Sequence, residues 1–559
     1  MRNLPRKTRW PNAALGFGLV CSLCASLSAQ GPPKRPEPAS VSGAFKIAGL
    51  VVSQASGEPL ARARVTLFDT TNPRHAQSMI TAEGGRFEFS PLPAGKYSLS
   101  GARRGFIPTA YEQHQQFSTA IVTGAGLETG NLILRLVPAA MISGKILDES
   151  LEPVHNATLS LYRENRAYGV SRITPAASDS SDDQGFYEFW PLMPGTYYVS
   201  AAARPWYAVH PPSSHPGGAE ISPPAVDASL DVSYPTTFYA DTTEADTATP
   251  VIIKGGDRVE IDIHLEPVQS LHLLFHVSQD GQNVFPTLQK RVFDSVEEVR
   301  NDGAQSVSPD TYEITGVPAG SYTVRLHSST SGESDQTTEM NLIKDDQELD
   351  SSPGEPLGSL TLSMKILGEE KLPEQLFVTL RDAQLRTVGF QTVDRNGGVH
   401  FEGLPAGKYA IAAFSPEKQY FVSQTSSPGS ENSGNSIDLT PGSPLSLSAL
   451  LLGGKTRVEG FVKRSGKAAA GVMVVLVPIG AESTIELFRR DQSDFDGSFL
   501  LPDVVPGSYA VIAIEDGWNV DWSVPTVLAR YTPRGQKVTI GPQMQGSISL
   551  PEPVEVQPR

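Results

Sequence analysis

The sequence has very little cysteine: Cys21 and Cys24 are the only two in 559 residues. Both lie in an apolar stretch from about Ala13 to Leu27, which follows four basic residues and ends in small residues. This order is typical of a secretory signal peptide, so we expect residues 1–29 to be removed on export. The mature chain would then contain no thiol, no disulfide and no cysteine-ligated metal.

Two further absences narrow the class of protein. After the signal peptide, no apolar run approaches the length of a membrane helix, so we expect no membrane span once the signal is removed. Positive charge is also scarce: the formal net charge is −16, and loss of the four basic residues of the signal takes it to −20. An acidic surface opposes binding to nucleic acid. We expect a secreted, periplasmic or cell-surface protein with no nucleic-acid partner.

One short pattern recurs five times. Each copy has an alternating apolar segment, a tight turn ending in glycine, and a tyrosine two residues after that glycine. The copies are Phe87–Tyr97, Tyr187–Tyr197, Tyr312–Tyr322, Val399–Tyr409 and Phe499–Tyr509. Because each copy of a tandem repeat forms the same supersecondary unit, we expect about five similar domains.

The first copy predicts how the motif packs. Phe87 and Phe89 alternate with charged residues, so we expect a strand with both rings in the core and the charges in water, and the same alternation in all five copies. We expect Gly95 and its equivalents to adopt a backbone conformation closed to other residues. Tyr97 should pack its ring inside while its hydroxyl reaches a backbone group, as at a tyrosine corner.

Short strands separated by turns, without helical periodicity, predict an all-β protein. We expect a tandem array of about five immunoglobulin-like or prealbumin-like antiparallel β-sandwich domains. The expected segments are a signal peptide at 1–29, a linker at 30–42, and sandwiches at 43–138, 139–267 with a long loop at 208–250, 268–356, 357–452 and 453–559. The sandwiches at 268–356 and 357–452 are divergent. Short junctions favour a semi-extended rod, roughly 150–200 Å long.

The motif and strand openings such as Ile142-Ser-Gly-Lys-Ile and Val458-Glu-Gly-Phe-Val resemble the carboxypeptidase regulatory-like domain. The resemblance covers most of Gly49–Phe106, Ile142–Trp206 and Val458–Trp518. It implies a transthyretin-like or prealbumin-like sandwich, related to collagen-adhesin B-type and starch-binding-like modules. In the carboxypeptidases this module accompanies a zinc peptidase domain, for which no stretch remains here. Peptidase activity is therefore not implied.

Aromatic residues are the candidate ligand-binding residues. Trp206, Trp518 and Phe106 each stand eleven residues after a motif glycine, which favours a shared packing role over a ligand site. Tyr207 and Trp522 have no such equivalents and are the better candidates for exposed aromatics that stack on sugar rings.

Several histidine and aspartate patterns could be metal ligands, but each can also be explained by an ordinary strand, loop or turn. His272 and His276 lie in an expected strand, and His210 and His215 lie in a Pro/Ser-rich loop, so we predict no metal site. The loops Asp179–Gly185, Asp394–Gly397 and Asp494–Gly497 are rich in oxygen ligands, but Asp or Asn before Gly is also what a turn needs. We expect no calcium site and no cofactor.

The adhesin relatives suggest one covalent feature. Their domains can join a lysine on the first strand to an asparagine on the last, beside a buried carboxylic acid, and Lys46, Asn131 and Glu88 occupy roughly those places. Two observations oppose this bond: Glu88 has the outward parity of the motif, and His272 stands where the lysine of the third sandwich should be.

No catalytic constellation is recognisable in the sequence. We therefore expect an exported, non-enzymatic multidomain scaffold whose partner is a cell-envelope protein or polysaccharide. The alternative is a carbohydrate-binding protein that uses exposed aromatics, and a third reading is a hydrolase with scattered carboxylates. Glycan pull-down separates the first two.

Overall fold

The computed structural model is built almost entirely of β-strands, which confirms the predicted all-β class. It describes residues 44–559 except 73–75, 168, 211–226, 277–283, 300–303, 309–310, 329–335, 345–346, 350–354, 370, 428–429 and 481–484. Five groups of strands follow one another along the chain, and each encloses its own hydrophobic core. We call these groups units 1 to 5.

Unit 1 has two facing sheets. Its strands are β1 (Phe45–Ser53), β2 (Arg64–Asp69), β3 (Ala76–Ile80), β4 (Arg86–Leu92), β5 (Gly95–Ala102), β6 (Phe106–Ile107), β7 (Thr109–Ala110), β8 (Ile121–Thr123) and β9 (Leu132–Pro138). One sheet has the order β4-β1-β9-β6, and the other has the order β3-β2-β5-β7, with β8 also paired to β5.

Unit 2 repeats this plan with a longer hairpin. Its elements are β10 (Ala140–Leu147), β11 (Thr158–Ala167), β12 (Val170–Ser180), β13 (Phe186–Leu192), β14 (Gly195–Ala202), η1 (Ala228–Leu230), β15 (Val232–Ser233), β16 (Thr237–Phe238), η2 (Ala245–Thr247), β17 (Val251–Ile253), β18 (Arg258–Glu260), β19 (Ile263–His264) and β20 (Val268–Gln269). The sheet β13-β10-β18 faces the sheet β12-β11-β14-β16, and β15 pairs with β20.

Unit 3 comprises β21 (Leu271–His276), β22 (Val284–Val292), β23 (Ser295–Glu298), β24 (Ala304–Ser308), β25 (Thr311–Val317), β26 (Gly320–Ser328), β27 (Gln336–Leu342), β28 (Gln347–Leu349) and β29 (Glu355–Pro356). Its two sheets have the orders β24-β25-β21-β28 and β23-β22-β26-β27-β29.

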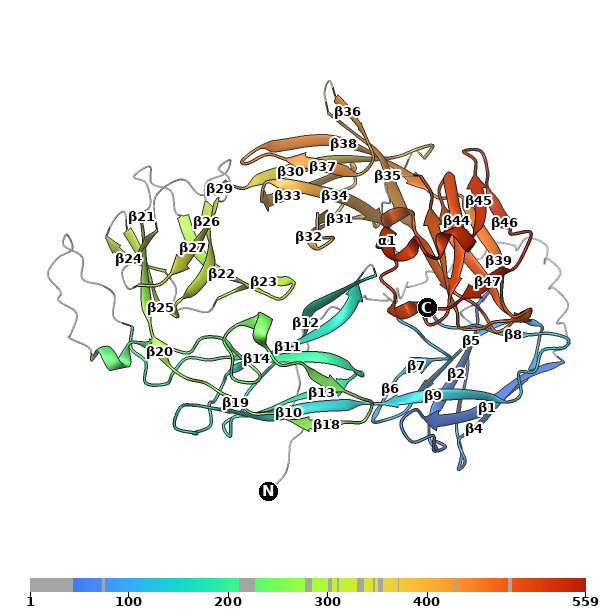
Figure 1. Ribbon diagram of the computed structural model, residues 1–559, viewed down its shortest axis with the longest axis horizontal. Helices are drawn as coiled ribbons and strands as arrows, with labels where there is room; N and C mark the ends of the chain where they lie inside the picture. The colour runs from blue at the N-terminus through green and yellow to red at the C-terminus, as the bar shows by residue number, and fades with distance from the viewer. Residues whose placement is uncertain are drawn as a thin grey trace, which may run out of the picture.

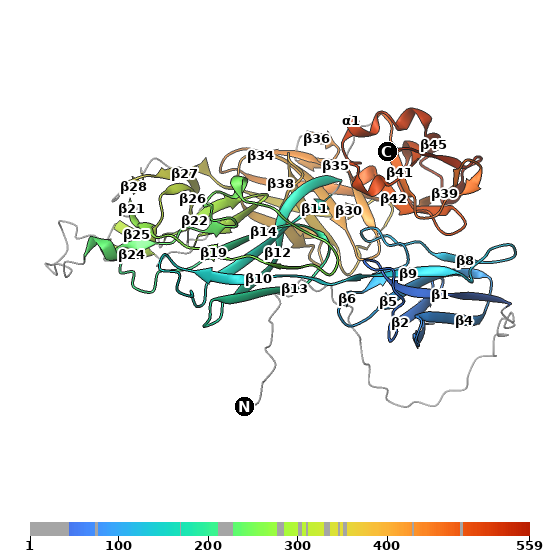
Figure 2. The ribbon, with the colours of Figure 1, turned by 60° about the horizontal axis from the view of Figure 1, so that its bottom comes forward.

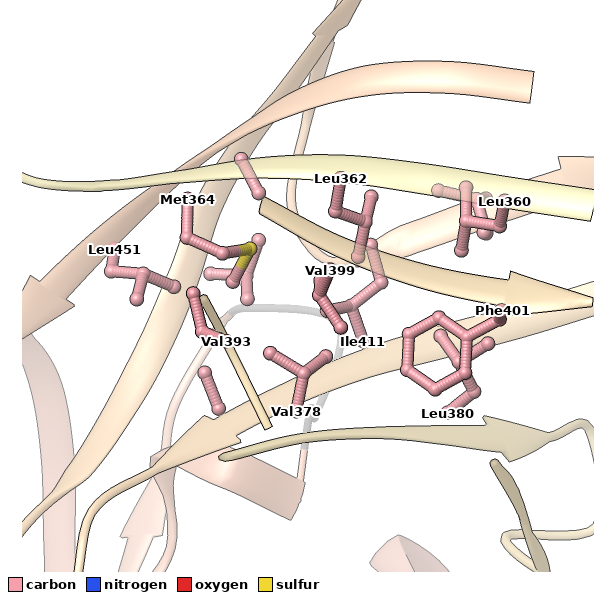
Figure 3. Close-up of a cluster of buried hydrophobic side chains, with 14 of the residues drawn as sticks. Leu360, Leu362, Met364, Val378, Leu380, Val393, Val399, Phe401, Ile411 and Leu451 are labelled. Carbon is pink, nitrogen blue, oxygen red and sulfur yellow. The ribbon is translucent and has the colours of Figure 1, made fainter. Parts of the chain in front are cut away.

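Unit 4 comprises β30 (Gly358–Ile366), β31 (Phe377–Asp382), β32 (Thr387–Thr392), β33 (Gly398–Leu404), β34 (Gly407–Phe414), β35 (Gln419–Ser427), β36 (Ser430–Ser433), β37 (Ser436–Leu439) and β38 (Pro444–Gly453). These strands form one continuous sheet of nine strands that folds over its own core. Figure 3 shows the side chains that meet there, with Leu360 and Phe401 at one end and Leu451 at the other.

Unit 5 adds short helical segments to the plan. Its elements are β39 (Thr456–Arg464), β40 (Lys467–Ala468), β41 (Met473–Pro478), η3 (Ile485–Leu487), β42 (Arg489–Gln492), β43 (Ser498–Val504), β44 (Gly507–Ile514), η4 (Gly517–Asn519), α1 (Pro525–Leu528), η5 (Thr532–Arg534), β45 (Gln536–Ile540), β46 (Gly546–Ser549) and β47 (Val554–Gln557). Residues from the segment η4 to η5 cover one face of β41 and β44 and form a second core there.

The opening strand of every unit has the same two partners. It pairs antiparallel with the first strand of the motif, as β1 does with β4. It pairs in parallel with a closing strand, as β1 does with β9. The sheets are therefore antiparallel except at this seam and between β44 and β47 of unit 5. The seam is parallel because the opening and closing strands of each unit run in the same direction.

The motif packs as predicted in four of the five units. Phe87 and Phe89 are buried while Arg86 and Glu88 are exposed, and the equivalent residues of units 2, 4 and 5 keep this alternation. In unit 3 the expectation is wrong, because Glu313, the equivalent of Glu88, is buried.

The predicted tyrosine corner is present in every unit. The Tyr97 hydroxyl donates to the carbonyl of Pro93, four residues earlier, at 3.1 Å, and the tyrosines of the other four copies make the same bond. The expectation for the glycine is wrong for Gly95, Gly320 and Gly507, which have no positive φ. A Cβ on Gly507 would lie 3.2 Å from the ring of Tyr509, so glycine is needed there to make room for the ring.

The five units form a closed ring and not the expected rod. Figure 1 shows them following one another around a loop that brings unit 5 beside unit 1, and Figure 2 shows the same neighbours from another side. The amide of Phe495 in unit 5 donates to the carbonyl of Ala120 in unit 1 at 3.0 Å. The chain closes because its two ends carry surfaces that fit each other.

The hairpin β11–β12 extends from unit 2 to three other units (Figure 1). Its strands have ten and eleven residues, against six and five in the equivalent hairpin β2–β3. Arg166 pairs with Asp521 of unit 5 and Arg172 donates to the Gln384 carbonyl of unit 4. The Asp294 carboxylate of unit 3 accepts from the amide of Ile173 at 2.9 Å.

Tyr509→Phe should lower the free energy of unfolding of unit 5 by about 1–2 kcal/mol, because it leaves the buried carbonyl of Val505 without the hydroxyl that donates to it at 3.0 Å. Urea unfolding of the full chain measures this loss through the fluorescence of Trp518 and Trp522, which are buried in the same unit. An unchanged transition would show that the corner hydrogen bond does not stabilise the unit.

Candidate functional site

One predicted aromatic pair lies on the surface of unit 2. The side chain of Trp206 is 85% exposed, and its ring meets that of Tyr207 edge to face with the centroids 5.7 Å apart. The Tyr207 hydroxyl donates to Glu149 at 2.5 Å, and Tyr234 donates to the other oxygen of the same carboxylate at 2.7 Å. The Tyr207 ring is thereby held in place beside an indole that is open to water.

The electrostatics of this pair follow from the shared carboxylate. Burial opposes the charge of Glu149, but the two tyrosine hydrogen bonds outweigh it and hold the pKa of that carboxyl below its ordinary value. Burial and the hydrogen bond to Glu149 raise the pKa of Tyr207 to about 12, so this hydroxyl stays protonated at neutral pH. The arrangement offers a flat apolar face and an anionic neighbour.

The other two predicted aromatics, Trp518 and Trp522, are buried, each with 6% of its surface exposed. The prediction that Trp522 is exposed is wrong, because the segment η4 to η5 folds back over the sheet and packs its ring at 5.7 Å from that of Phe488. Trp518 stacks on His114 of unit 1, with the ring centroids 5.3 Å apart.

Trp206 and Trp518 therefore do not share the packing role that their equal spacing suggests. Unit 1 covers Trp518 of unit 5, whereas Trp206 of unit 2 faces solvent. The spacing of residues within one repeat contains no information about contacts between repeats.

Several clusters of hydrogen-bonded and ionic side chains lie at the joints between units. At the joint of units 1 and 5, the Lys96 ammonium contacts Asp494 at 2.6 Å and the hydroxyl of Ser498 at 2.7 Å. The other oxygen of Asp494 accepts from the amide of Ala120 at 3.0 Å. Asp494 is thus bonded to both a side chain and the backbone of unit 1.

A second set of contacts extends this joint. The side-chain amide of Gln492 donates to the Glu112 carbonyl at 2.5 Å and to the Thr119 hydroxyl at 2.8 Å. Arg490 donates to Gln115 at 3.1 Å and lies over the ring of Phe117, 5.2 Å from its centroid. The joint is therefore mostly hydrogen-bonded.

The joint also removes charged groups from water. Burial raises the pKa of Asp491 to about 6, against the hydrogen bonds that its carboxylate accepts from the amides of Leu500 and Gln492. Burial likewise raises the pKa of Asp494, although Lys96 counteracts it. Burial lowers the pKa of Arg490 to about 10. The charged forms of these side chains are thus disfavoured here.

A histidine that we assigned to chance placement lies at the joint of units 2 and 3. His272 contacts Glu313 at 2.7 Å through Nδ1 and Asp231 at 3.0 Å through Nε2, and the other oxygen of Asp231 lies 2.8 Å from Nδ1 of His210. Each ring nitrogen of His272 thus lies at hydrogen-bond distance from a carboxyl oxygen. This pairing explains why Glu313 breaks the parity of the motif: its carboxyl group is buried against the imidazole of His272.

Sequence reasoning missed this cluster because Asp231 and His272 meet only when the loop after β14 folds onto unit 3. The side chain of His276, in β21, is not described, and His215 lies outside the described residues. The described part of the chain contains no group of three or more side chains arranged to hold a metal ion.

The oxygen-rich loops form turns. Oδ1 of Asp394 accepts from the amides of Asn396 at 2.7 Å and Gly398 at 2.8 Å, and Asp182 makes the equivalent bonds in unit 2. These carboxylates shape their own hairpins, whereas Asp494 is part of the joint with unit 1.

The residues considered for a covalent cross-link lie in water. The Lys46 ammonium is 4.0 Å from Glu88, and the two side chains are 58% and 55% exposed. Asn131 is also exposed. The geometry lacks the buried acid that such a bond requires.

Comparison with protein families places unit 1 in a known domain class. Residues 46–123 match the carboxypeptidase regulatory-like domain. The match begins in β1 and ends with β8, so it covers most of unit 1 and confirms the resemblance found in the motif. No curated protein matches the sequence.

Solved structures similar to this chain include pilins. The Bacillus anthracis TIE protein is 13% identical, with 73% of this chain and 75% of that chain covered and a TM-score of 0.17. BcpA, the major pilin subunit of Bacillus cereus, is 10% identical, with 72% and 99% covered and a TM-score of 0.14. GBS52, a minor pilin of Streptococcus agalactiae, is 10% identical, with 40% and 97% covered and a TM-score of 0.21. Scores this low carry no argument about the arrangement of the units.

His272→Leu should destabilise unit 3 by about 1–3 kcal/mol, because it removes a hydrogen-bond partner at 2.7 Å from the fully buried carboxyl group of Glu313. Hydrogen exchange at the amides of β21 and β25 measures the loss. His400→Leu is the matched control: this histidine pairs with Glu402 at 3.0 Å, but both side chains are exposed, so the change should stay within about 0.5 kcal/mol. Equal effects of the two substitutions would contradict a stabilising role of the buried pair.

The stability of unit 5 should fall as the pH rises from about 4 to 6. The pKa of Asp491 is raised in the folded chain, so its contribution is complete below the ordinary pKa of 3.8 and is lost as the pH passes about 6. Asp491→Asn should remove on the order of 1–3 kcal/mol of this pH dependence. Urea unfolding at several pH values, followed by Trp518 and Trp522 fluorescence, tests it.

Asp438→Asn, which changes an exposed carboxylate of unit 4, is the control for the loss of one charge. If Asp491→Asn and the wild-type chain show the same pH slope, Asp491 is not the group responsible.

Proposed function

We propose that this protein is an exported, non-enzymatic scaffold that presents a ring of five sandwich domains to a protein or polysaccharide of the cell envelope. The proposed domains are the segments 43–138, 139–267, 268–356, 357–452 and 453–559, and export rests on the signal-like segment 1–29. None of the described helices is long and apolar enough to cross a membrane.

The observation that carries this proposal is where the ionisable side chains lie. The described clusters around Asp494 and His272 join one unit to the next, with Lys96 and Asp231 as the partners across each joint. A third joint, between units 4 and 5, uses Arg381 and Glu486, which are 2.5 Å apart and almost completely buried. The charged residues thus serve to hold the architecture, which suits a scaffold.

Carbohydrate binding is the second candidate, and the exposure of Trp206 favours it. An indole with 85% of its surface in water is unusual for a large apolar side chain, and its face suits stacking against the apolar face of a sugar ring. Glu149 lies beside the pair through Tyr207 and offers a hydrogen-bond acceptor to a sugar hydroxyl.

Residues 30–559, screened against arrays of glycans and envelope proteins with and without calcium, separate the two candidates. The scaffold proposal predicts saturable retention of an envelope component that Trp206→Ala leaves unchanged. Glycan binding that is abolished by Trp206→Ala would contradict the scaffold proposal and favour a carbohydrate-binding protein. Trp190→Ala is the matched control, since Trp190 lies on the same unit and is 45% exposed. A chain that retains nothing would contradict both.

A further inference from the structure

Unit 1 is attached to the ring differently from the other units. In the described chain, the hydrogen bonds and ring contacts that unit 1 makes with other units fall in two places. One is its covalent connection to unit 2, where only Ala139 separates β9 from β10 and its amide donates to the Gly105 carbonyl at 2.9 Å. The other is the joint with unit 5. The contacts of the hairpin β11–β12 are with units 3, 4 and 5.

The joint of units 1 and 5 combines hydrogen bonds with a few aromatic contacts, whereas two other joints include clusters of apolar side chains. Between units 2 and 3, Tyr162, Phe238 and Val292 form a continuous apolar cluster. Between units 4 and 5, Phe421 and Leu452 pack onto the core of unit 5. The joint of units 1 and 5 has the crossing aromatics Phe495 and Phe117 and the stack of His114 on Trp518, together with the hydrogen bonds around Asp494, Gln492 and Arg490. Polar interfaces of this kind resemble transient ones.

The two faces of this joint are different surfaces. Unit 1 contributes Lys96 and the segment 112–120, and unit 5 contributes the segment 490–498. A contact between two different complementary surfaces is heterologous. If the surface on one chain binds the complementary surface on the next chain, repetition of this contact builds a closed oligomer or an open filament.

We propose that the surface of unit 5 around Asp494 is a binding site for unit 1 of a second copy of this chain. Unit 1 turns about Ala139, leaves unit 5 of its own chain and docks on unit 5 of a neighbour with the same contacts. The contacts within the ring and between chains are identical, so protein concentration and the strain at the hinge decide between them. This inference refines the proposed scaffold function by naming one partner, and it rests on that function only for its biological meaning.

A chemical cross-link across the Lys96–Asp494 salt bridge shows which chains are in contact. A carbodiimide activates the Asp494 carboxylate, the Lys96 amine attacks the activated carbonyl carbon, and an amide forms as the urea departs. Residues 30–559 are prepared with light and with heavy nitrogen, mixed in equal amounts, equilibrated and then cross-linked. Mass spectrometry of the peptide pair that joins residues 96 and 494 shows whether its two halves come from one chain or from two.

If unit 1 exchanges between chains, cross-linked peptide pairs with one light and one heavy half should appear, and their share of all pairs should rise toward about half as the protein concentration increases. The molecular mass measured by light scattering should rise with it. Isotopically pure pairs at every concentration, including after equilibration in mild urea, would overturn the proposal. This outcome would leave the scaffold function untouched, because binding to envelope components is measured separately.

A matched pair of variants tests the same surface without the cross-link. Lys96→Met should make self-association, followed by light scattering, reach equilibrium roughly tenfold faster, since it removes a charge-assisted contact to Asp494 that has to break before unit 1 leaves its own chain. Lys408→Met is the control, because Lys408 follows the motif glycine of unit 4 as Lys96 does in unit 1 and is exposed. Equal rates for the two variants, with both chains folded by circular dichroism, would contradict the assignment of this surface.

Discussion

The hairpin β11–β12 is the interaction on which the ring depends. A chain of sandwiches joined by short connections has no intrinsic reason to close, because each junction adds its own bend and twist. The extended hairpin holds three units around itself, because its side chains contact Asp294 of unit 3, the Gln384 carbonyl of unit 4 and Asp521 of unit 5. With units 3, 4 and 5 held around it, unit 5 is placed where it meets unit 1.

The joints rely on charge that is partly removed from water. Such pairs contribute little net stability, because desolvation offsets most of the attraction, but leaving one partner alone is costly. In the joint of units 4 and 5, Glu486 is buried against the guanidinium of Arg381, and in the joint of units 2 and 3, Glu313 is buried against the imidazole of His272. This asymmetry favours one arrangement of the units over others, since a misplaced neighbour would leave a buried carboxylate unpaired.

The five copies of the motif share a local role and differ in what surrounds them. The tyrosine corner occurs in all five because it satisfies a carbonyl four residues away and needs no other unit. Residues just outside the motif have diverged according to their neighbours. Trp206 and Trp518 stand at the same spacing, yet one faces water and the other is covered by unit 1.

The sequence by itself determined the features that arise within one repeat. Alternation of Phe87 and Phe89 with charged residues specifies a strand with one buried face, and the spacing from Gly95 to Tyr97 specifies the corner, because both depend on residues a few positions apart. Tertiary structure alone decided the closed ring, the burial of Trp522 and the contact between His272 and Asp231. These features bring together side chains from different units or from segments that fold back over a sheet, and a repeat pattern contains no information about the orientation of one unit relative to the next.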